Sequence, residues 1–154
     1  MNRSRRRFLE LSAGTVVLRG TGAAGLLMSG PVAAAWNKAG FESKAVAEVL
    51  KQLGATDAVE SKDIVITAPD IAENGAVVPI AVTSKLPNTE SIAIIAEKNP
   101  FPLAAVLDFS NGAEGYASVR IKMGQTSDVR AVVKAGGKFY TAAKEVKVTV
   151  GGCG

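Results

Sequence analysis

The sequence of 154 residues contains no histidine, and this absence removes several kinds of active site at once. Without histidine there is no Ser–His or Cys–His nucleophile pair, no imidazole general base and no imidazole metal ligand. The sequence also contains no phosphate-binding P-loop, no dinucleotide-binding glycine motif, no Cys-x-x-Cys-His and no Ca²⁺-binding loop. We therefore expect no catalytic residue, no cofactor and no bound metal, although carboxylate or lysine chemistry stays open.

Cysteine is almost absent as well, because Cys153 is the only one. A single thiol cannot close an intramolecular disulfide or build a multi-thiolate zinc site. Cys153 lies between glycines in the segment 151–154. Burial is not expected there, since chain ends fray unless they are tied down. Prenylation does not fit either, because it needs a cysteine four residues from the end.

The first 35 residues have the features of an export signal. Ser4-Arg5-Arg6-Arg7-Phe8-Leu9 matches the twin-arginine pattern, and Ala33-x-Ala35 is a cleavage motif before Trp36. The weakly apolar stretch between them is interrupted by Arg19, so it is a poor membrane span and we expect no membrane anchor. We expect residues 1–35 to be a twin-arginine signal peptide that is removed after folded export to the periplasm.

Folded export is useful when a cofactor is inserted, or a partner bound, before the protein crosses the membrane. Since no cofactor motif is present, we expect a partner that lacks its own signal.

Charge excludes one class of partner once the signal is set aside. The chain has 18 basic and 14 acidic residues, of which five and one lie in residues 1–35. Residues 36–154 therefore hold 13 of each and carry no net charge. No basic stripe remains that would indicate binding to nucleic acid.

The remaining sequence predicts one helix followed by strands. Apolar residues at helical spacing over Glu42–Leu53, with Gly54 after them, predict the helix. After Lys62 the hydrophobic pattern takes the period of strands. Strands are expected at Asp63–Thr67, Ala76–Ser84, Ser91–Glu97, Leu103–Phe109, Ala117–Lys122, Asp128–Ala135, Lys138–Ala142 and Glu145–Val150.

Turn signals separate these strands at short intervals. Gly136-Gly137 predicts a two-residue hairpin, and Pro79 predicts that its strand is an edge strand or has a bulge. Further turns are expected at Pro87-Asn88, Asn99-Pro100 and Asn111-Gly112. The pattern predicts a mainly β domain over residues 36–150, an immunoglobulin-like antiparallel β-sandwich with an N-terminal helix.

Residues 151–154 are expected to form a flexible C-terminal arm. Gly151, Gly152 and Gly154 have no side chains, so the chain around Cys153 is slim and conformationally free. Nothing near Cys153 in the sequence would activate the thiol, which favours a carrier that is threaded into another protein's active site. Two alternatives stay open: an exported binding module with an intermolecular disulfide at Cys153, and a small redox enzyme that uses Cys153 directly.

Several stretches resemble the SoxY family, the sulfur carrier subunits of the bacterial thiosulfate-oxidising Sox complex. The similar stretches are the twin-arginine leader, Glu73–Ile80, Tyr116–Glu145 and the final Val146–Gly154. The resemblance implies a carrier and not an enzyme. It also implies a heterodimer with SoxZ, a signal-less β-sandwich protein.

The resemblance further implies a reaction cycle on one cysteine, which would be Cys153 here. A c-type cytochrome enzyme oxidatively joins thiosulfate to it as a cysteine S-thiosulfonate. A hydrolase then releases sulfate and leaves a persulfide, and a sulfane dehydrogenase oxidises the remaining sulfur for a second hydrolysis. Cys153 would be the covalent attachment site, while Gly151, Gly152 and Gly154 would give the arm clearance and reach.

Overall fold

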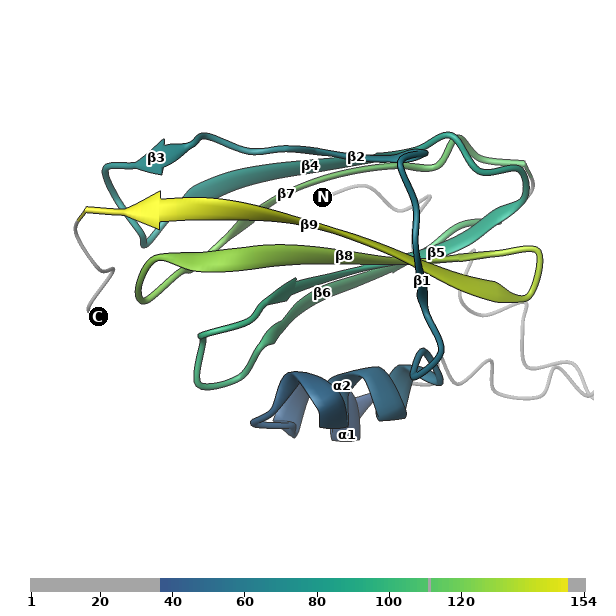
Figure 1. Ribbon diagram of the computed structural model, residues 1–154, viewed down its shortest axis with the longest axis horizontal. Coiled ribbons are helices and arrows are strands. Elements are labelled where there is room, and N and C mark those ends of the chain that lie inside the picture. Colours follow the sequence, from purple (N-terminus) through teal and green to yellow (C-terminus); the bar gives the residue numbers. More distant parts are fainter. Residues whose placement is uncertain (1–36, 111, 150–154) are drawn as a thin grey trace, which may run out of the picture. The chain divides into compact units, whose positions relative to one another are not determined.

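A computed structural model describes residues 37–110 and 112–149 of the chain (Figure 1). The predicted signal at residues 1–35, Trp36, Val150 and the predicted arm at residues 151–154 lie outside the described residues. The described part forms two short helices followed by nine strands in two sheets. This arrangement confirms the predicted fold class, a mainly β sandwich of immunoglobulin-like type.

The helix predicted at Glu42–Leu53 is found as α2 (Val46–Leu53), and a further short helix, α1 (Lys38–Glu42), precedes it and was not predicted. Between them the hydroxyl of Ser43 donates to the carbonyl of Ala39 at 2.8 Å, and Ser43 itself has an extended backbone. A serine side chain that bonds to the backbone competes with helix continuation, so α2 begins at Val46 and the predicted start at Glu42 is four residues too early. Helix α2 ends as predicted at Gly54, whose φ is 71°.

The strands build one large and one small sheet. The large sheet has the order β1 (Val59–Glu60), β9 (Lys138–Val148), β8 (Ser127–Ala135), β5 (Thr89–Ala96) and β6 (Leu103–Asp108), with β3 (Ile71–Ala72) also paired to β9. The small sheet has the order β2 (Ile64–Thr67), β4 (Val78–Ser84) and β7 (Tyr116–Ile121).

Strand β9 replaces two predicted strands with a single strand of 11 residues. The sequence Ala142-Ala143-Lys144 suggested a break, because alanine and lysine are weak strand formers. Pairing with β8 overrides this preference, since the ladder continues from Ala135↔Lys138 to Ser127↔Val146. The strands β1 and β3 run parallel to β9 along its other edge and were not predicted. Each has two residues, which is too short for a periodic pattern.

Pro79 lies in a central strand, so the prediction of an edge strand is wrong for β4 as a whole. The pairing of β4 with β2 ends at Thr67↔Ala81, whereas Pro79 pairs only with Arg120 of β7. The proline is therefore tolerated because β4 has a single neighbour at that position.

The predicted hairpin at Gly136-Gly137 is confirmed. Both glycines have positive φ, 55° and 73°, as a type I′ turn between β8 and β9 requires. The turn is held by Glu90, which accepts from the Gly137 amide at 2.8 Å and lies 2.7 Å from Lys134 Nζ. The hydrogen bond from Lys134, together with the one from Gly137, lowers the pKa of the Glu90 carboxyl.

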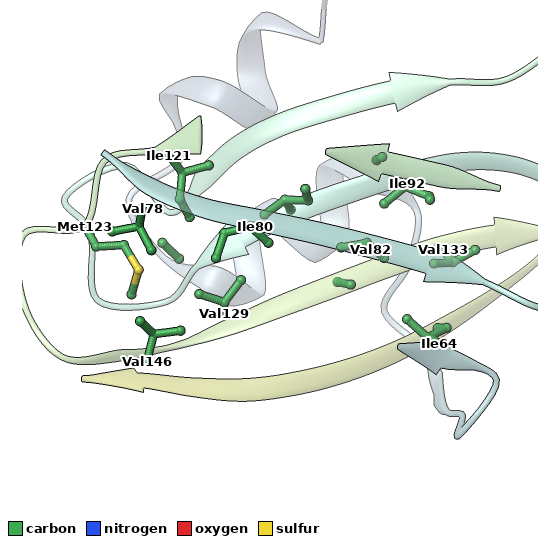
Figure 2. Packing of buried hydrophobic residues seen from close by; sticks show 14 of the residues in the cluster. Ile64, Val78, Ile80, Val82, Ile92, Ile121, Met123, Val129, Val133 and Val146 are labelled. Atoms are coloured by element: carbon green, nitrogen blue, oxygen red, sulfur yellow. The ribbon is translucent and has the colours of Figure 1, made fainter. Parts of the chain in front are cut away.

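Two hydrophobic clusters lie on the two faces of the large sheet. The first joins the two sheets and contains the side chains that Figure 2 labels: Ile64, Val78, Ile80, Val82, Ile92, Ile121, Met123, Val129, Val133 and Val146. The second joins the helices to the outer face and contains Val49, Ala55, Ala93, Ile95, Leu103 and Val132. Strand β5 contributes to both, so its residues 92–96 form a continuous apolar run without alternation.

Replacing Ile94 by alanine should destabilise the domain by about 2–5 kcal/mol, because the side chain is fully buried between the sheets. The free energy of unfolding from urea titration measures this effect. Val65→Ala is the matched control, since Val65 is 41% exposed and its truncation should cost much less. Equal losses in the free energy of unfolding for the two variants would contradict the burial of Ile94 between the sheets.

Candidate functional site

The described residues show the base from which the predicted arm extends. Cys153 and the glycines Gly151, Gly152 and Gly154 lie outside the described residues, so their predicted roles are not tested by the fold. Thr149 is the last described residue and directly follows β9. The surroundings of the end of β9 are therefore the described structure nearest in sequence to Cys153.

One side of the β9 end is held by the segment 70–73. Strand β3 in this segment pairs in parallel with Lys147 and Val148. The amide of Lys147 donates to the carbonyl of Asp70 at 3.0 Å, and the amide of Thr149 donates to that of Ala72 at 3.2 Å. These bonds extend β9 beyond Val146, where its pairing with β8 stops.

The other side is held by a side chain. At Val148 strand β8 is no longer available as a partner, and the amide of Val148 donates instead to Thr126 Oγ1 at 2.9 Å. The three successive amides of residues 147, 148 and 149 thus have acceptors on alternate sides, as in a regular central strand.

The loop that carries Thr126 is itself fixed to the core. Met123 is fully buried in the cluster between the sheets, and its amide donates to the carbonyl of Gly75 at 2.7 Å. Asn99 bridges the same loop, because its Nδ2 donates to Lys122 O at 2.7 Å and its Oδ1 accepts from the Gly124 amide at 3.1 Å. The bond from Met123 to Gly75 joins the two supports of the β9 end into one connected structure.

Lys144 attaches the segment before β3 to the middle of β9. Its Nζ donates to the carbonyl of Ala68 at 2.7 Å and lies 3.0 Å from Asp70 Oδ1. The side chain of Asp70 is 88% exposed, so the ion pair itself contributes little to stability. Asp70 and Glu73 thus lie exposed on either side of β3.

The distance that the thiol can travel is bounded by the chain itself. Cys153 lies four residues after Thr149 in the sequence. At about 3.5 Å per residue, Cys153 cannot lie more than about 14 Å from Thr149. A partner that takes the thiol into its active site must therefore approach the supported end of β9.

Little else in the described residues suggests chemistry. Within residues 37–110 and 112–149 no group of three or more acidic residues could hold a metal ion. A hollow of about 490 Å³ lies beside Thr89 and Gly115, at the hairpin end of the sheet and not at the end of β9. In the part of the chain that the structure describes, neither helix is long and apolar enough to span a bilayer.

These features define a class of protein, a two-sheet β-sandwich whose last strand leads into a segment with a single cysteine. The family model "Sulfur oxidation protein SoxY" matches residues 50–153 and so extends through Cys153. The chain belongs to the SoxY family, which confirms the resemblance seen in the sequence.

Solved structures agree with this assignment. The sulfur carrier protein SoxY from Chlorobium limicola f thiosulfatophilum is 36% identical, with 70% of this chain and 95% of that chain covered and a TM-score of 0.63. An E23A superoxide reductase (neelaredoxin) from Ignicoccus hospitalis is 19% identical, with 64% and 86% covered and a TM-score of 0.50, which shows the fold alone. A search of the curated proteins finds no match.

Sequence reasoning missed the residues that support the end of β9. Thr126 carried no signal, because its partner Val148 is 22 residues away and only the finished sheet brings them together. Asn99 was predicted as a turn residue. Its side-chain amide also bonds to Lys122 and Gly124 in another loop, and no residue spacing in the sequence predicted that contact. The short strand β3 was likewise invisible in the hydrophobic pattern.

Proposed function

We propose that this protein is a periplasmic sulfur carrier that holds thiosulfate-derived intermediates covalently on Cys153 and presents them to partner enzymes. The observation that carries the proposal is the family match through Cys153, together with 36% identity to a sulfur carrier protein. The absence of histidine supports a carrier that depends on its partners for catalysis. The supported end of β9 adds a fixed origin for the segment that bears the thiol.

The chemistry of loading is an oxidation. The thiolate of Cys153 forms a bond to the outer, sulfane sulfur of thiosulfate, two electrons leave to the c-type cytochrome partner, and the product is a cysteine S-thiosulfonate. The thiolate is the nucleophilic form of the residue. Since the chain has no histidine, we expect the partner to provide deprotonation and to accept the electrons.

The chemistry of unloading is a hydrolysis. Water attacks the terminal sulfone sulfur in the hydrolase, sulfate and two protons leave, and a persulfide stays on Cys153. A sulfane dehydrogenase, where present, removes six electrons from that sulfur and passes them to a redox partner, while three water molecules supply its oxygens and six protons leave. The product is a cysteine S-sulfonate, from which a second hydrolysis releases sulfate and restores the thiol. Gly151, Gly152 and Gly154 keep the segment narrow enough to enter each of these active sites.

The test is mass spectrometry of the peptide that contains Cys153, isolated after turnover with thiosulfate and the partner enzymes. Sulfur adducts on Cys153 support the carrier. A mixed disulfide with one fixed protein would instead support the alternative of a binding module.

A stable partner is the next expectation, and we propose a heterodimer with SoxZ. Folded export without a cofactor motif is best explained by a partner that travels with this chain. The complex should bury at least about 1,200 Å² in total, as specific interfaces usually do. Light scattering on natively purified protein should give the mass of the heterodimer; a monomer of this chain alone would contradict the proposal.

Export should depend on the arginine pair of the leader. Replacing Arg5 and Arg6 together by lysine keeps the charge but changes the twin-arginine motif, so precursor should accumulate in the cytoplasm. Immunoblots of cytoplasmic and periplasmic fractions measure the effect. Arg3→Lys, which lies before the S-R-R-x-F-L motif, is the matched control. Normal periplasmic accumulation of the double variant would rule out this export route.

A further inference from the structure

We propose that Thr126 is a positioning residue for the carrier segment, because its hydroxyl oxygen fixes the point at which the chain leaves the sheet. The inference rests on the proposed carrier function but can be tested apart from it. Its basis is the hydrogen bond of 2.9 Å from the Val148 amide to Thr126 Oγ1.

This hydrogen bond lies where β9 has no neighbouring strand on the β8 side. Strand β8 begins at Ser127, opposite Val146, so no backbone of β8 faces Val148. The Thr126 side chain takes the place of that missing strand. On the opposite edge, the carbonyl of Ala72 accepts from the Thr149 amide at 3.2 Å, and Glu73 O lies 3.5 Å from Thr149 Oγ1. Without Thr126 the end of β9 would be held from one edge only.

Thr126 can serve in this way because its own loop is fixed. The buried Met123 anchors the loop, and Gln125 Nε2 donates to Lys98 O at 3.2 Å. The amide of Lys98 in turn donates to Ser127 Oγ at 3.0 Å. Because the loop is already ordered, the hydrogen bond between Thr126 and the end of β9 does not cost the conformational entropy of ordering the loop as well.

A fixed origin matters because it sets the length of the tether. With Thr149 held, four residues lead to Cys153; if residues 147–149 come free, seven residues do. The effective concentration of a tethered group falls with about the −3/2 power of tether length, so this change lowers it roughly twofold. Thr126 therefore affects how often the thiol of a docked carrier reaches the partner's active site, without touching sulfur.

The test compares Thr126→Val with Thr126→Ser in the natively purified mature protein. Valine has nearly the shape of threonine but offers no acceptor, whereas serine keeps the oxygen. In Thr126→Val, hydrogen exchange at the amides of Val148 and Thr149 should be about fivefold faster, as expected for loss of one hydrogen bond. The value of kcat/KM with thiosulfate and the partner enzymes should fall, but by less than the roughly twofold expected for complete release, because β3 still holds the other edge of β9. Alkylation of Cys153 by iodoacetamide should be unchanged.

In Thr126→Ser all three quantities should return to those of the parent protein. Unchanged amide exchange in Thr126→Val, or the same change in both variants, would overturn the role assigned to the hydroxyl oxygen. Faster exchange with an unchanged kcat/KM would overturn the positioning role. Carriage that survives in Cys153→Ser would overturn the proposed function itself, which the exchange measurement does not depend on.

Discussion

Replacing Cys153 by serine is expected to reduce thiosulfate oxidation by the complete set of partner enzymes to the rate measured without the carrier. A serine hydroxyl cannot form the bond to sulfur on which every step of the proposed cycle depends, and the sequence has no second thiol to replace it. Sulfate released from thiosulfate in the reconstituted system measures the effect. The fold should be unchanged, because the substitution alters none of the buried residues of the two clusters.

The control for this variant is its stability and its assembly. The free energy of unfolding of Cys153→Ser and its association with the partner should equal those of the parent protein. Substantial sulfate release by a variant that is folded and assembled would show that sulfur is carried elsewhere, and the carrier role of Cys153 would have to be abandoned.

Replacing Gly152 by valine should reduce turnover with the partner enzymes by tenfold or more. The new side chain stands beside the thiol and restricts the backbone, so the segment becomes wider and less adaptable where it must enter a partner. A tenfold loss corresponds to about 1.4 kcal/mol of transition-state stabilisation. The measured quantity is kcat/KM for the carrier as substrate of each partner enzyme.

Two comparisons separate clearance from reactivity. Alkylation of Cys153 by a small reagent should be almost the same in Gly152→Val as in the parent, since the sulfur is not altered. The turnover of Gly152→Ala should lie between that of the parent protein and that of Gly152→Val, because the methyl group of alanine is smaller than the branched side chain of valine. If partner turnover survives Gly152→Val intact, the glycines do not serve to provide clearance.

The β-sandwich was predictable because most of its strands can be recognised from residues close together in the sequence. Ile80 and Val82 alternate with less buried neighbours in β4, and Gly136-Gly137 supplies the turn that joins β8 to β9. Strand β5 was recognisable from its length and from the turn signals around it, although it is buried on both faces and does not alternate. Local patterns of this kind depend on residues close in sequence, which is why they could be read without a structure.

The misjudged elements all depend on contacts between distant residues or on one side chain. Helices α1 and α2 are separate because the Ser43 hydroxyl bonds to the carbonyl of Ala39. The apolar spacing on both sides of Ser43 gave no sign of this bond. The continuity of β9 through Ala143 comes from its pairing with Arg130 of β8. Thr126 and β3 support the end of β9 only because segments far apart in the sequence lie side by side in the folded domain. Residue spacing in the sequence does not predict such contacts.

The candidate site divides in the same way. The role proposed for Cys153 was suggested by composition, because a single thiol among glycines in a chain without histidine has few uses. The proposed cargo, thiosulfate-derived sulfur, rests on resemblance to the SoxY family and not on the residues alone. The hydrogen bonds that hold Thr149 at the end of β9 became visible only with the sheet.

The most direct test of the central claim is mass spectrometry of the Cys153 peptide at successive times after adding thiosulfate that carries a heavy isotope in one of its two sulfur atoms. With the sulfane sulfur labelled, the label should appear first in a cysteine S-thiosulfonate and then persist in the persulfide after sulfate leaves. With the sulfone sulfur labelled, it should appear in the first adduct and then pass entirely into sulfate. The same labelled adducts on any other residue, or a Cys153 that stays free or bound in a disulfide while sulfate accumulates, would contradict the account.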